Sequence, residues 1–288
     1  MDKMKEMRIV HINLSGSNGG AAIAAYRLHC EMRKNGLDSK MLVAFQGIRS
    51  RQEGVYQFSI RKKLHHKVNV MINQLLYPAS KIIGTYSFAF NGCDLSKEND
   101  IREADFIYLH WINMGMLSIY DVERILKLGR PVFWFMHDMW PLTGGCHHAF
   151  DCTKYLEKCI DCPLLHRKRD MLFCKFQFEE KYRIFSKYSN LKIIAPSTWL
   201  FHLASTSLLF KNKQLIHIPN LCDINIFKPM GKGWAKRLFQ KVKSLYYLGL
   251  LQGGWEIYIK GGNICKKPFC IYLLLPMRLL YLVSIIKQ

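Results

Sequence analysis

Acidic residues are scarce in this sequence. Its 288 residues include 21 aspartates and glutamates against 42 lysines and arginines, which gives a formal net charge of +21. A charge this positive is typical of nucleic-acid-binding proteins. Nearly half of the excess, however, follows Asp223, where eleven basic residues accompany a single acidic one, Glu256. A nucleic-acid groove needs basic and aromatic residues interleaved within the folded domain, so this distribution argues against a nucleic-acid partner and favours an anionic ligand or an anionic membrane surface.

Long apolar runs are absent as well. Residues 1–14 are charged and then only briefly apolar, so they lack the apolar core of a secretory signal peptide. The stretch 271–286 is mostly apolar but only 16 residues long, and Pro276 and Arg278 interrupt it, whereas a membrane span needs about 20 residues. We therefore expect a cytoplasmic protein, with peripheral association at the inner face of the plasma membrane in preference to a transmembrane anchor.

Segments typical of buried strands alternate with segments typical of helices. Apolar runs without alternation suit strands that are covered on both faces of a parallel sheet. The predicted strands are 7–14, 39–45, 105–110, 132–137, 191–195 and 214–218, and the predicted helices are 21–35, 61–76, 118–128, 176–188 and a short one from Trp199. This order specifies an α/β fold with a doubly wound, Rossmann-like parallel sheet. We expect this domain over residues 1–225, followed by a short, incomplete second domain or an aberrant basic and apolar tail over residues 226–288.

The predicted helix 61–76 is amphipathic and basic. Its apolar residues on one face are Leu64, Val68, Met71, Ile72 and Leu75, and its basic residues near the start are Arg61, Lys62, Lys63 and Lys67. A basic amphipathic helix can lie on an anionic bilayer. Such a stripe is more often the core-facing side of a surface helix, so we expect it to face the core.

A glycine-rich loop joins the first predicted strand to its helix. The loop runs from Ser15 to Gly20 with the spacing G-x-x-G-G, and the dinucleotide fingerprint G-x-G-x-x-G is absent. Such a loop brings backbone N–H groups to an anion at the helix N-terminus, or it forms a tight turn that uses the conformational freedom of glycine. The sequence is compatible with both interpretations.

Polar residues follow the predicted strands. They are His110, Asn113, His137, Asp138 and Ser197. In an open parallel sheet, ligands bind outside the carboxyl ends of the strands, so residues at these positions are candidates for a site. The alternative for the His137-Asp138 pair is a hydrogen bond that merely ends a strand. Because Gly19 falls at the same edge, we expect a ligand site there.

Four cysteines follow within one loop. Cys146, Cys152, Cys159 and Cys162 have the spacing C-x5-C-x6-C-x2-C. In a cytosolic chain, cysteines are thiols or metal ligands before they are disulfides, and C-x2-C is half of a tetrahedral zinc site. A loop of this length without regular periodicity needs something to order it. That is either a structural zinc ion or a set of buried thiols that can form a disulfide on oxidation. Four sulfur ligands would leave no position for catalysis, so we expect no catalytic metal here.

Several motifs together resemble a known family. They are G-S-x-G-G-A-A-x-A-A, L-H-W-I-N, F-W-x-x-H-D-M-W-P-L-T-G-G-C-H, C-x2-C-P, A-P-S-x-W-L and I-P-N-x-x-D-x-x-x-F-K-P. In this order they are similar to the N-terminal half of family 4 glycosyltransferases from bacterial surface-polysaccharide clusters, over about residues 7–230. The resemblance implies a GT-B architecture of two Rossmann-like domains and a retaining transfer without a catalytic metal. It also implies a nucleotide-sugar donor and a lipid-linked glycan acceptor.

The resemblance also implies roles for individual residues. His137 would contact the sugar near the reacting centre, with Asp138 beside it on the acceptor side. Gly19, Gly20 and Ser197 would bind the donor and its phosphates, and His110 and Asn113 would bind the acceptor.

The chain departs from this family after Pro229. Only 59 residues follow, and they contain no pair of glutamates spaced as in the family's E-x7-E donor motif. We interpret this as a broken or truncated reading frame, with a membrane-binding tail as the alternative, and expect no sugar transfer by the chain alone. A different class of function, a non-catalytic binding module for a glycan or a membrane, stays open.

Overall fold

The computed structural model describes residues 7–47, 53–77, 85–227, 246–251 and 254–259. Its main feature is a seven-stranded sheet in which every neighbouring pair is parallel, in the order β3-β2-β1-β4-β5-β6-β7. The strands are β1 (Arg8–Ser15), β2 (Asp38–Phe45), β3 (Val55–Gln57), β4 (Phe106–Leu109), β5 (Val132–Phe135), β6 (Leu191–Ala195) and β7 (Gln214–His217). The predicted doubly wound α/β fold is confirmed.

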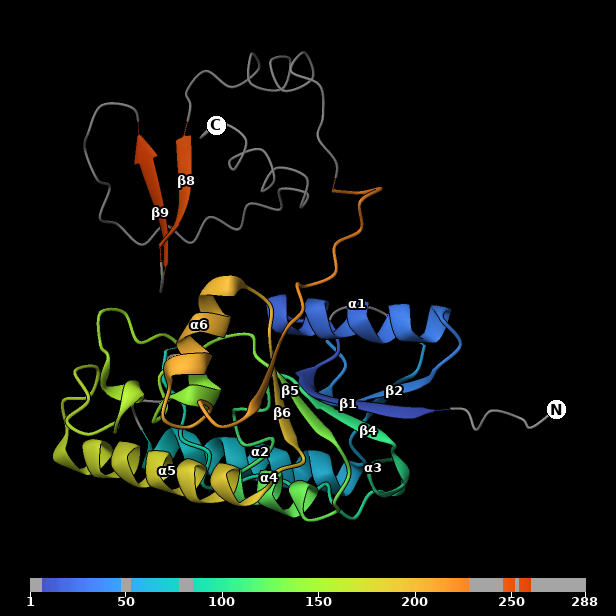
Figure 1. Ribbon diagram of the computed structural model, residues 1–288, viewed down its shortest axis with the longest axis horizontal. Coiled ribbons are helices and arrows are strands. Elements are labelled where there is room, and N and C mark those ends of the chain that lie inside the picture. Colours follow the sequence, from blue (N-terminus) through green and yellow to red (C-terminus); the bar gives the residue numbers. More distant parts are fainter. Residues whose placement is uncertain (1–6, 48–52, 78–84, 228–245, 252–253, 260–288) are drawn as a thin grey trace. The chain divides into compact units, whose positions relative to one another are not determined.

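Helices cover both faces of this sheet. They are α1 (Gly20–Lys34), α2 (Ile60–Leu76), α3 (Asn99–Glu103), α4 (Ile119–Leu126), α5 (Lys168–Lys187) and α6 (Thr198–Thr206). Helix α1 lies on one side, and α2, α4 and α5 lie along the other (Figure 1). The strand β1 is buried from Ile9 to Ser15, including its polar residues His11, Asn13 and Ser15, which is typical of a strand covered on both faces of the sheet.

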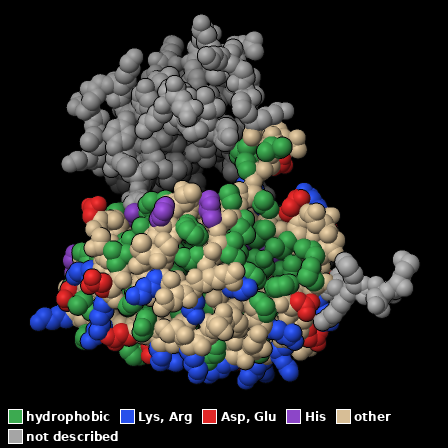
Figure 2. Space-filling model, viewed as in Figure 1, with side chains coloured by type: hydrophobic (Ala, Val, Ile, Leu, Met, Phe, Trp, Pro, Cys, Tyr) green, Lys and Arg blue, Asp and Glu red, His purple; other side chains and the backbone are tan. Residues whose placement is uncertain are grey.

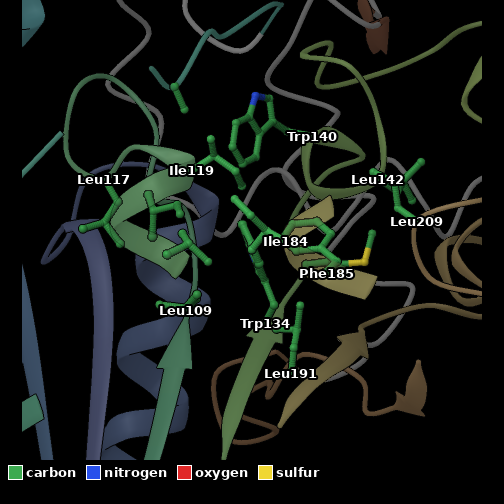
Figure 3. Packing of buried hydrophobic residues seen from close by; sticks show 14 of the residues in the cluster. Leu109, Leu117, Ile119, Trp134, Trp140, Leu142, Ile184, Phe185, Leu191 and Leu209 are labelled. Carbon is green, nitrogen blue, oxygen red and sulfur yellow. The ribbon is translucent and has the colours of Figure 1, made fainter. Parts of the chain in front are cut away.

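The main core lies between the sheet and the layer of α4 and α5. Trp134 of β5 meets the ring of Phe185 edge to face, with 5.7 Å between the ring centroids, and the Trp140 ring lies 6.0 Å away (Figure 3). Helix α4 begins with a capping box: Asp121 N donates to Ser118 Oγ, and Ser118 N donates to the Asp121 carboxylate. The aromatic contacts hold α5 and the loop after β5 against the sheet, and the capping box defines where α4 begins.

Three elements differ from the sequence-based expectation. The strand β3 and the helix α3 were not predicted, because three and five residues are too few to show a hydrophobic period. Helix α5 begins at Lys168, not near Phe176. Its first two turns mix charged residues with Met171, Phe173 and Cys174, which obscures the apolar period.

The apolar stripe of α2 does not face the core, and that expectation was wrong. The buried residues of α2 are Asn69 and Asn73. A tight turn next to the helix, with positive φ at Met114 and Gly115, presents backbone carbonyls to it. His66 Nε2 lies 3.0 Å from Met114 O, and Asn69 Nδ2 donates to Gly115 O at 3.3 Å. Because buried carbonyls require donors, polar side chains occupy the inner face and the apolar stripe points outward.

The contacts divide the chain after Leu221 into two units. In the second, the structure describes an antiparallel pair of strands, β8 (Tyr246–Leu251) and β9 (Gly254–Ile259). The apolar stretch 271–286, with its expected interfacial role, lies outside the described residues. Among the helices that are described, none is long and apolar enough to span a bilayer.

Candidate functional site

The candidate site lies where the winding of the sheet reverses. The strand β1 pairs with β2 on one side and with β4 on the other. The strands up to β3 are therefore added on one side of β1, and the strands from β4 onward are added on the other. Ligands of open α/β sheets bind at such a switch point, outside the carboxyl ends of the strands. Gly19 follows β1, His110 follows β4, and His137 follows β5, so the structure brings these predicted residues to the same edge.

Three histidines from neighbouring strands form a continuous row. Nδ1 of His11, within β1, lies 3.0 Å from Nε2 of His110, and Nδ1 of His110 lies 3.0 Å from Nε2 of His137. The successive rings are stacked, with centroids 5.3 and 5.2 Å apart. His11 and His110 are buried, and His137 is half-buried at the outer end. The row therefore runs from the interior of the sheet to the edge at the carboxyl ends of its strands.

All three imidazoles are kept neutral by burial. Burial, with a smaller effect from the nearby His29, lowers the pKa of His11 from 6.5 to about 3. Burial lowers the pKa of His137 from 6.5 to about 4, although the Asp138 carboxylate acts in the opposite direction. The pKa of His110 is also well below 6.5, first through burial and then through its two histidine neighbours. Each ring therefore carries one N–H at neutral pH.

The surroundings of His11, at the buried end of the row, indicate which ring nitrogen donates in each hydrogen bond. Nε2 of His11 is buried and has no hydrogen-bond partner among the described residues. A buried N–H without an acceptor is rarer than an acceptor without a donor, which favours the proton of His11 on Nδ1. His11 then donates to Nε2 of His110, and Nδ1 of His110 donates to Nε2 of His137. This leaves Nδ1–H of His137 as a donor, and within the described part of the chain no residue accepts from it.

Asp138 is engaged in holding the neighbouring loop. Its Oδ2 accepts hydrogen bonds from Trp111 Nε1 at 2.9 Å and from His147 Nδ1 at 2.6 Å, and its Oδ1 accepts from Trp140 N at 2.9 Å. Burial by itself would raise the pKa of Asp138, but the His147 imidazole and these hydrogen bonds hold it below 3.8. An acceptor committed in this way orients the rings around it and has little capacity left to act as a base.

The same carboxylate completes a Ser-His-Asp connection. Ser87 Oγ lies 2.8 Å from Nε2 of His147, whose Nδ1 binds Asp138. This is the connectivity of a nucleophilic triad. Ser87, however, is only 6% exposed, so its hydroxyl has no room for the acyl group that such a nucleophile carries. The arrangement therefore fixes the loop and does not supply a nucleophile.

Helix α5 holds the loop that follows Asp138. Lys181 Nζ donates to Trp140 O at 2.6 Å and to Thr143 O at 2.9 Å, and it lies 3.4 Å from the centroid of the Trp140 ring. Gln177 Nε2 donates to Gly144 O at 2.8 Å. Burial lowers the pKa of Lys181 from 10.5 to about 7, and the nearby thiols and Asp138 act in the opposite direction. The Trp-Pro-Leu-Thr-Gly-Gly segment is thus attached to a buried lysine on a distant helix.

The glycine-rich loop leaves the N-terminus of α1 uncapped. Gly19 has a φ of 89°, which favours glycine, and no side chain caps the helix. A Cβ atom added at Gly19 or Gly20 would meet no atom of the described residues within 4 Å, so those residues leave the space around them open. Ser15 Oγ shapes the loop by accepting from Asn18 N at 2.9 Å. The first-turn N–H groups and the helix dipole are therefore available to an anion.

Two of the predicted site residues, Ser197 and Asn113, are less accessible to a ligand than expected. Ser197 is engaged as a helix cap, and Asn113 is buried. Ser197 caps α6 by accepting from Leu200 N at 3.2 Å, as expected of a helix N-cap. Asn113 is buried, and its Oδ1 has no hydrogen-bond partner among the described residues. The sequence did not indicate a further aromatic pair, the exposed Trp199 and the half-buried His148. The ring of Trp199 stacks on that of His148, with centroids 5.7 Å apart and 12° between the planes.

Five cysteines surround one small cavity. The four predicted ones are joined by Cys174 of α5, and Tyr86 also lines the space, which measures about 10 Å³. The described cysteines are all free thiols. Burial raises the pKa of Cys146 to about 12, which opposes the thiolate form that a metal needs. Within the described ranges, no three His, Cys, Asp or Glu side chains are arranged to hold a metal ion.

The sequence was compared with known proteins. No protein-family model matches the chain. It is 21% identical over 165 residues to the putative colanic acid biosynthesis glycosyl transferase WcaC of Escherichia coli (strain K12). The aligned stretch covers 56% of this chain and 40% of that relative, so the chain matches less than half of the relative's length.

The structural zinc ion stays a prediction, and metal analysis checks it. Thiolates are the ligands that zinc prefers in structural sites, but these five thiols would have to rearrange and deprotonate around the ion. If the prediction holds, protein purified without a chelating tag contains about one zinc per chain, and its loop thiols resist titration. A zinc content near zero, with reactive thiols in the folded protein, rejects the zinc ion and leaves a cluster of buried thiols.

The histidine row makes stability depend on pH. Because the pKa values of His11 and His137 are lower in the folded chain than in the unfolded one, the unfolded chain binds more protons below pH 6.5. The stabilisation that these neutral histidines give the folded chain is therefore complete above pH 6.5 and is lost as the pH falls below it. Between pH 7 and pH 5 the free energy of unfolding should fall by about 2 kcal/mol for each buried ring. Urea unfolding at several pH values measures this, and His11→Gln should make the dependence shallower. Equal stability at both pH values contradicts neutral, buried imidazoles.

Proposed function

We propose that this chain takes part in glycosyl transfer in cell-surface polysaccharide biosynthesis. The observation that carries the proposal is the row of His11, His110 and His137, which leads to the switch-point edge of the sheet. The similarity to a glycosyl transfer protein of colanic acid biosynthesis supports it. The N-terminal motifs of the sequence point to the acceptor-side domain of a family 4, GT-B type enzyme.

In this proposal a nucleotide-sugar is the donor. Its diphosphate would accept hydrogen bonds from the first-turn N–H groups of α1, beside Gly19 and Gly20, where the helix dipole favours negative charge. His137 would donate from Nδ1 to an oxygen of the transferred sugar, near the reacting centre. A neutral donor of fixed direction stabilises charge that develops on that oxygen in the transition state.

In this proposal the buried polar residues orient the groups that contact the ligand. His110 and Asn113 lie below the surface, so we assign them to orienting His137 and the β4 loop in place of direct contact with the acceptor. Asp138 would likewise hold the rings of Trp111 and His147. The hydroxyl of Ser197 keeps its proton for a ligand while its oxygen caps α6. The stacked pair of Trp199 and His148 offers an exposed aromatic face of the kind on which sugar rings pack.

The acceptor would be a lipid-linked glycan at the cytoplasmic face of the plasma membrane. Transfer needs the donor to be held from both sides, because near-attack geometry depends on closing a site around it. The sequence contains no E-x7-E pair for the donor ribose. We therefore expect weak nucleotide-sugar binding and no transfer by this chain alone.

Calorimetry with a panel of nucleotide-sugars tests the proposed site. The wild-type chain should bind one of them weakly, and His137→Ala should reduce the affinity by about tenfold, the value of one lost hydrogen bond. Gly20→Ala should also weaken binding without lowering stability, because its methyl group would meet none of the residues that the structure describes and alanine favours a helix. In a transferase that combines the same His-Asp-Met-Trp-Pro segment with a complete donor domain, alanine at the position of His137 should lower turnover about 100-fold.

Lys34→Gln provides a matched control, because this exposed lysine lies at the opposite end of α1. Equal affinity in all variants rejects the assigned donor site. Binding of a glycan without any nucleotide-sugar would favour the alternative, a non-catalytic binding module. Robust turnover by the purified chain would refute the expected inactivity while supporting glycosyl transfer.

A further inference from the structure

The outward face of α2 carries a row of exposed apolar side chains. Ile60, Leu64, Val68, Met71 and Leu75 recur at intervals of three and four residues, which places them on one side of the helix. We call these five residues the α2 stripe. Ile60 is 88% exposed and Leu75 is 79% exposed. A contiguous apolar row of this length is rare on a monomer surface and marks an interaction site.

The orientation of the stripe is fixed by the opposite face of the helix. Lys62 Nζ lies 2.6 Å from a carboxylate oxygen of Glu98 and donates to Asp94 O at 2.8 Å. Further along, His66 and Asn69 bind backbone carbonyls of the β4 loop. Rolling the helix to bury the stripe would break these contacts and expose their carbonyl partners. These polar contacts therefore keep the α2 stripe on the outer face of the helix.

The surroundings of the stripe are basic. Helix α2 contains no aspartate or glutamate. At 3.6 residues per turn, Arg61 and Lys67 fall on opposite sides of the stripe, and none of the described carboxylates forms an ion pair with either. A helix with an apolar face and basic flanks is the form that lies in the interface of a bilayer.

The neighbouring helix extends this surface. Arg169 Nη2 of α5 donates to Leu76 O at the end of α2 at 3.0 Å, and the rings of Tyr77 and Phe173 meet with centroids 5.2 Å apart. The adjoining turns of α5 expose two apolar and two basic side chains, those of Leu172, Phe176, Lys168 and Lys175. Figure 2 shows Lys and Arg side chains along the lower edge of the molecule, where Figure 1 places α5.

We propose that the α2 stripe, with its basic flanks and the start of α5, is a docking surface for an anionic lipid bilayer. The apolar side chains would enter the boundary between headgroups and acyl chains, and the basic ones would contact lipid phosphates. A second copy of the chain fits less well. It would bring Arg61 and Lys67 of both copies together, and α2 has no carboxylate to pair with them. This inference goes beyond the proposed sugar transfer and does not depend on it.

Sedimentation of the full chain with lipid vesicles tests the docking surface. The wild-type chain should bind vesicles that contain phosphatidylglycerol and bind neutral phosphatidylcholine vesicles more weakly. Replacing Leu64, Met71 and Leu75 by glutamine should reduce the partition coefficient at least about 100-fold, because several buried CH₂ groups are lost. Arg61→Gln with Lys67→Gln should reduce it about fivefold per residue on the anionic vesicles only. The substituted side chains are exposed, so the melting temperature should not change.

Tyr56→Gln with Lys34→Gln is the matched control, because it removes an exposed ring and an exposed lysine from other elements. It should bind vesicles like the wild-type chain. Unchanged binding by the α2 variants would overturn the proposal, because the contact would then lie elsewhere in the chain. Absence of vesicle binding by the wild-type chain would overturn it too. So would a dimer in solution that the α2 substitutions dissociate.

Discussion

Two imidazole contacts of 3.0 Å connect β1 with the residues that follow β4 and β5, beside the switch point of the sheet. They connect an interior position on β1 with the edge of the sheet that follows β5. Their burial keeps the rings neutral, and neutrality gives the row a direction, because each ring then has one donor and one acceptor. The half-buried His137 therefore presents a defined atom to a ligand. The adjacent loop is positioned independently, through Asp138 and through Lys181 of α5.

The helices on the two faces of the sheet present different kinds of surface. On one side, α1 offers an uncapped N-terminus beside the switch point. On the other, α2 turns its polar residues inward and leaves apolar and basic ones outside. A transferase that acts on a lipid-linked glycan would need both features: a site for a charged donor and a way to stay near the membrane that holds its acceptor.

The fold and half of the site follow from the sequence, and the remainder does not. His110 and His137 could be predicted because they end apolar strands. His11 could not, because its role depends on the pairing of β1 with β4, which no local pattern reports. The helical period of α2 located its stripe, but the carbonyls of the Met114–Gly115 turn decided which face lies inward. Cys174 could not be predicted as part of the cysteine cluster, because it lies on α5, outside the loop that contains the other four cysteines.

We infer that the buried row fixes the proton of His137 on Nδ1. Nitrogen-15 NMR of histidine-labelled protein measures this directly, because the two ring nitrogens of a neutral imidazole have different shifts according to which one carries the proton. We expect a neutral His137 at pH 7 with the proton on Nδ1, and the same tautomer for His11 and His110. A protonated Nε2 in His137, or a doubly protonated ring at that pH, would contradict it.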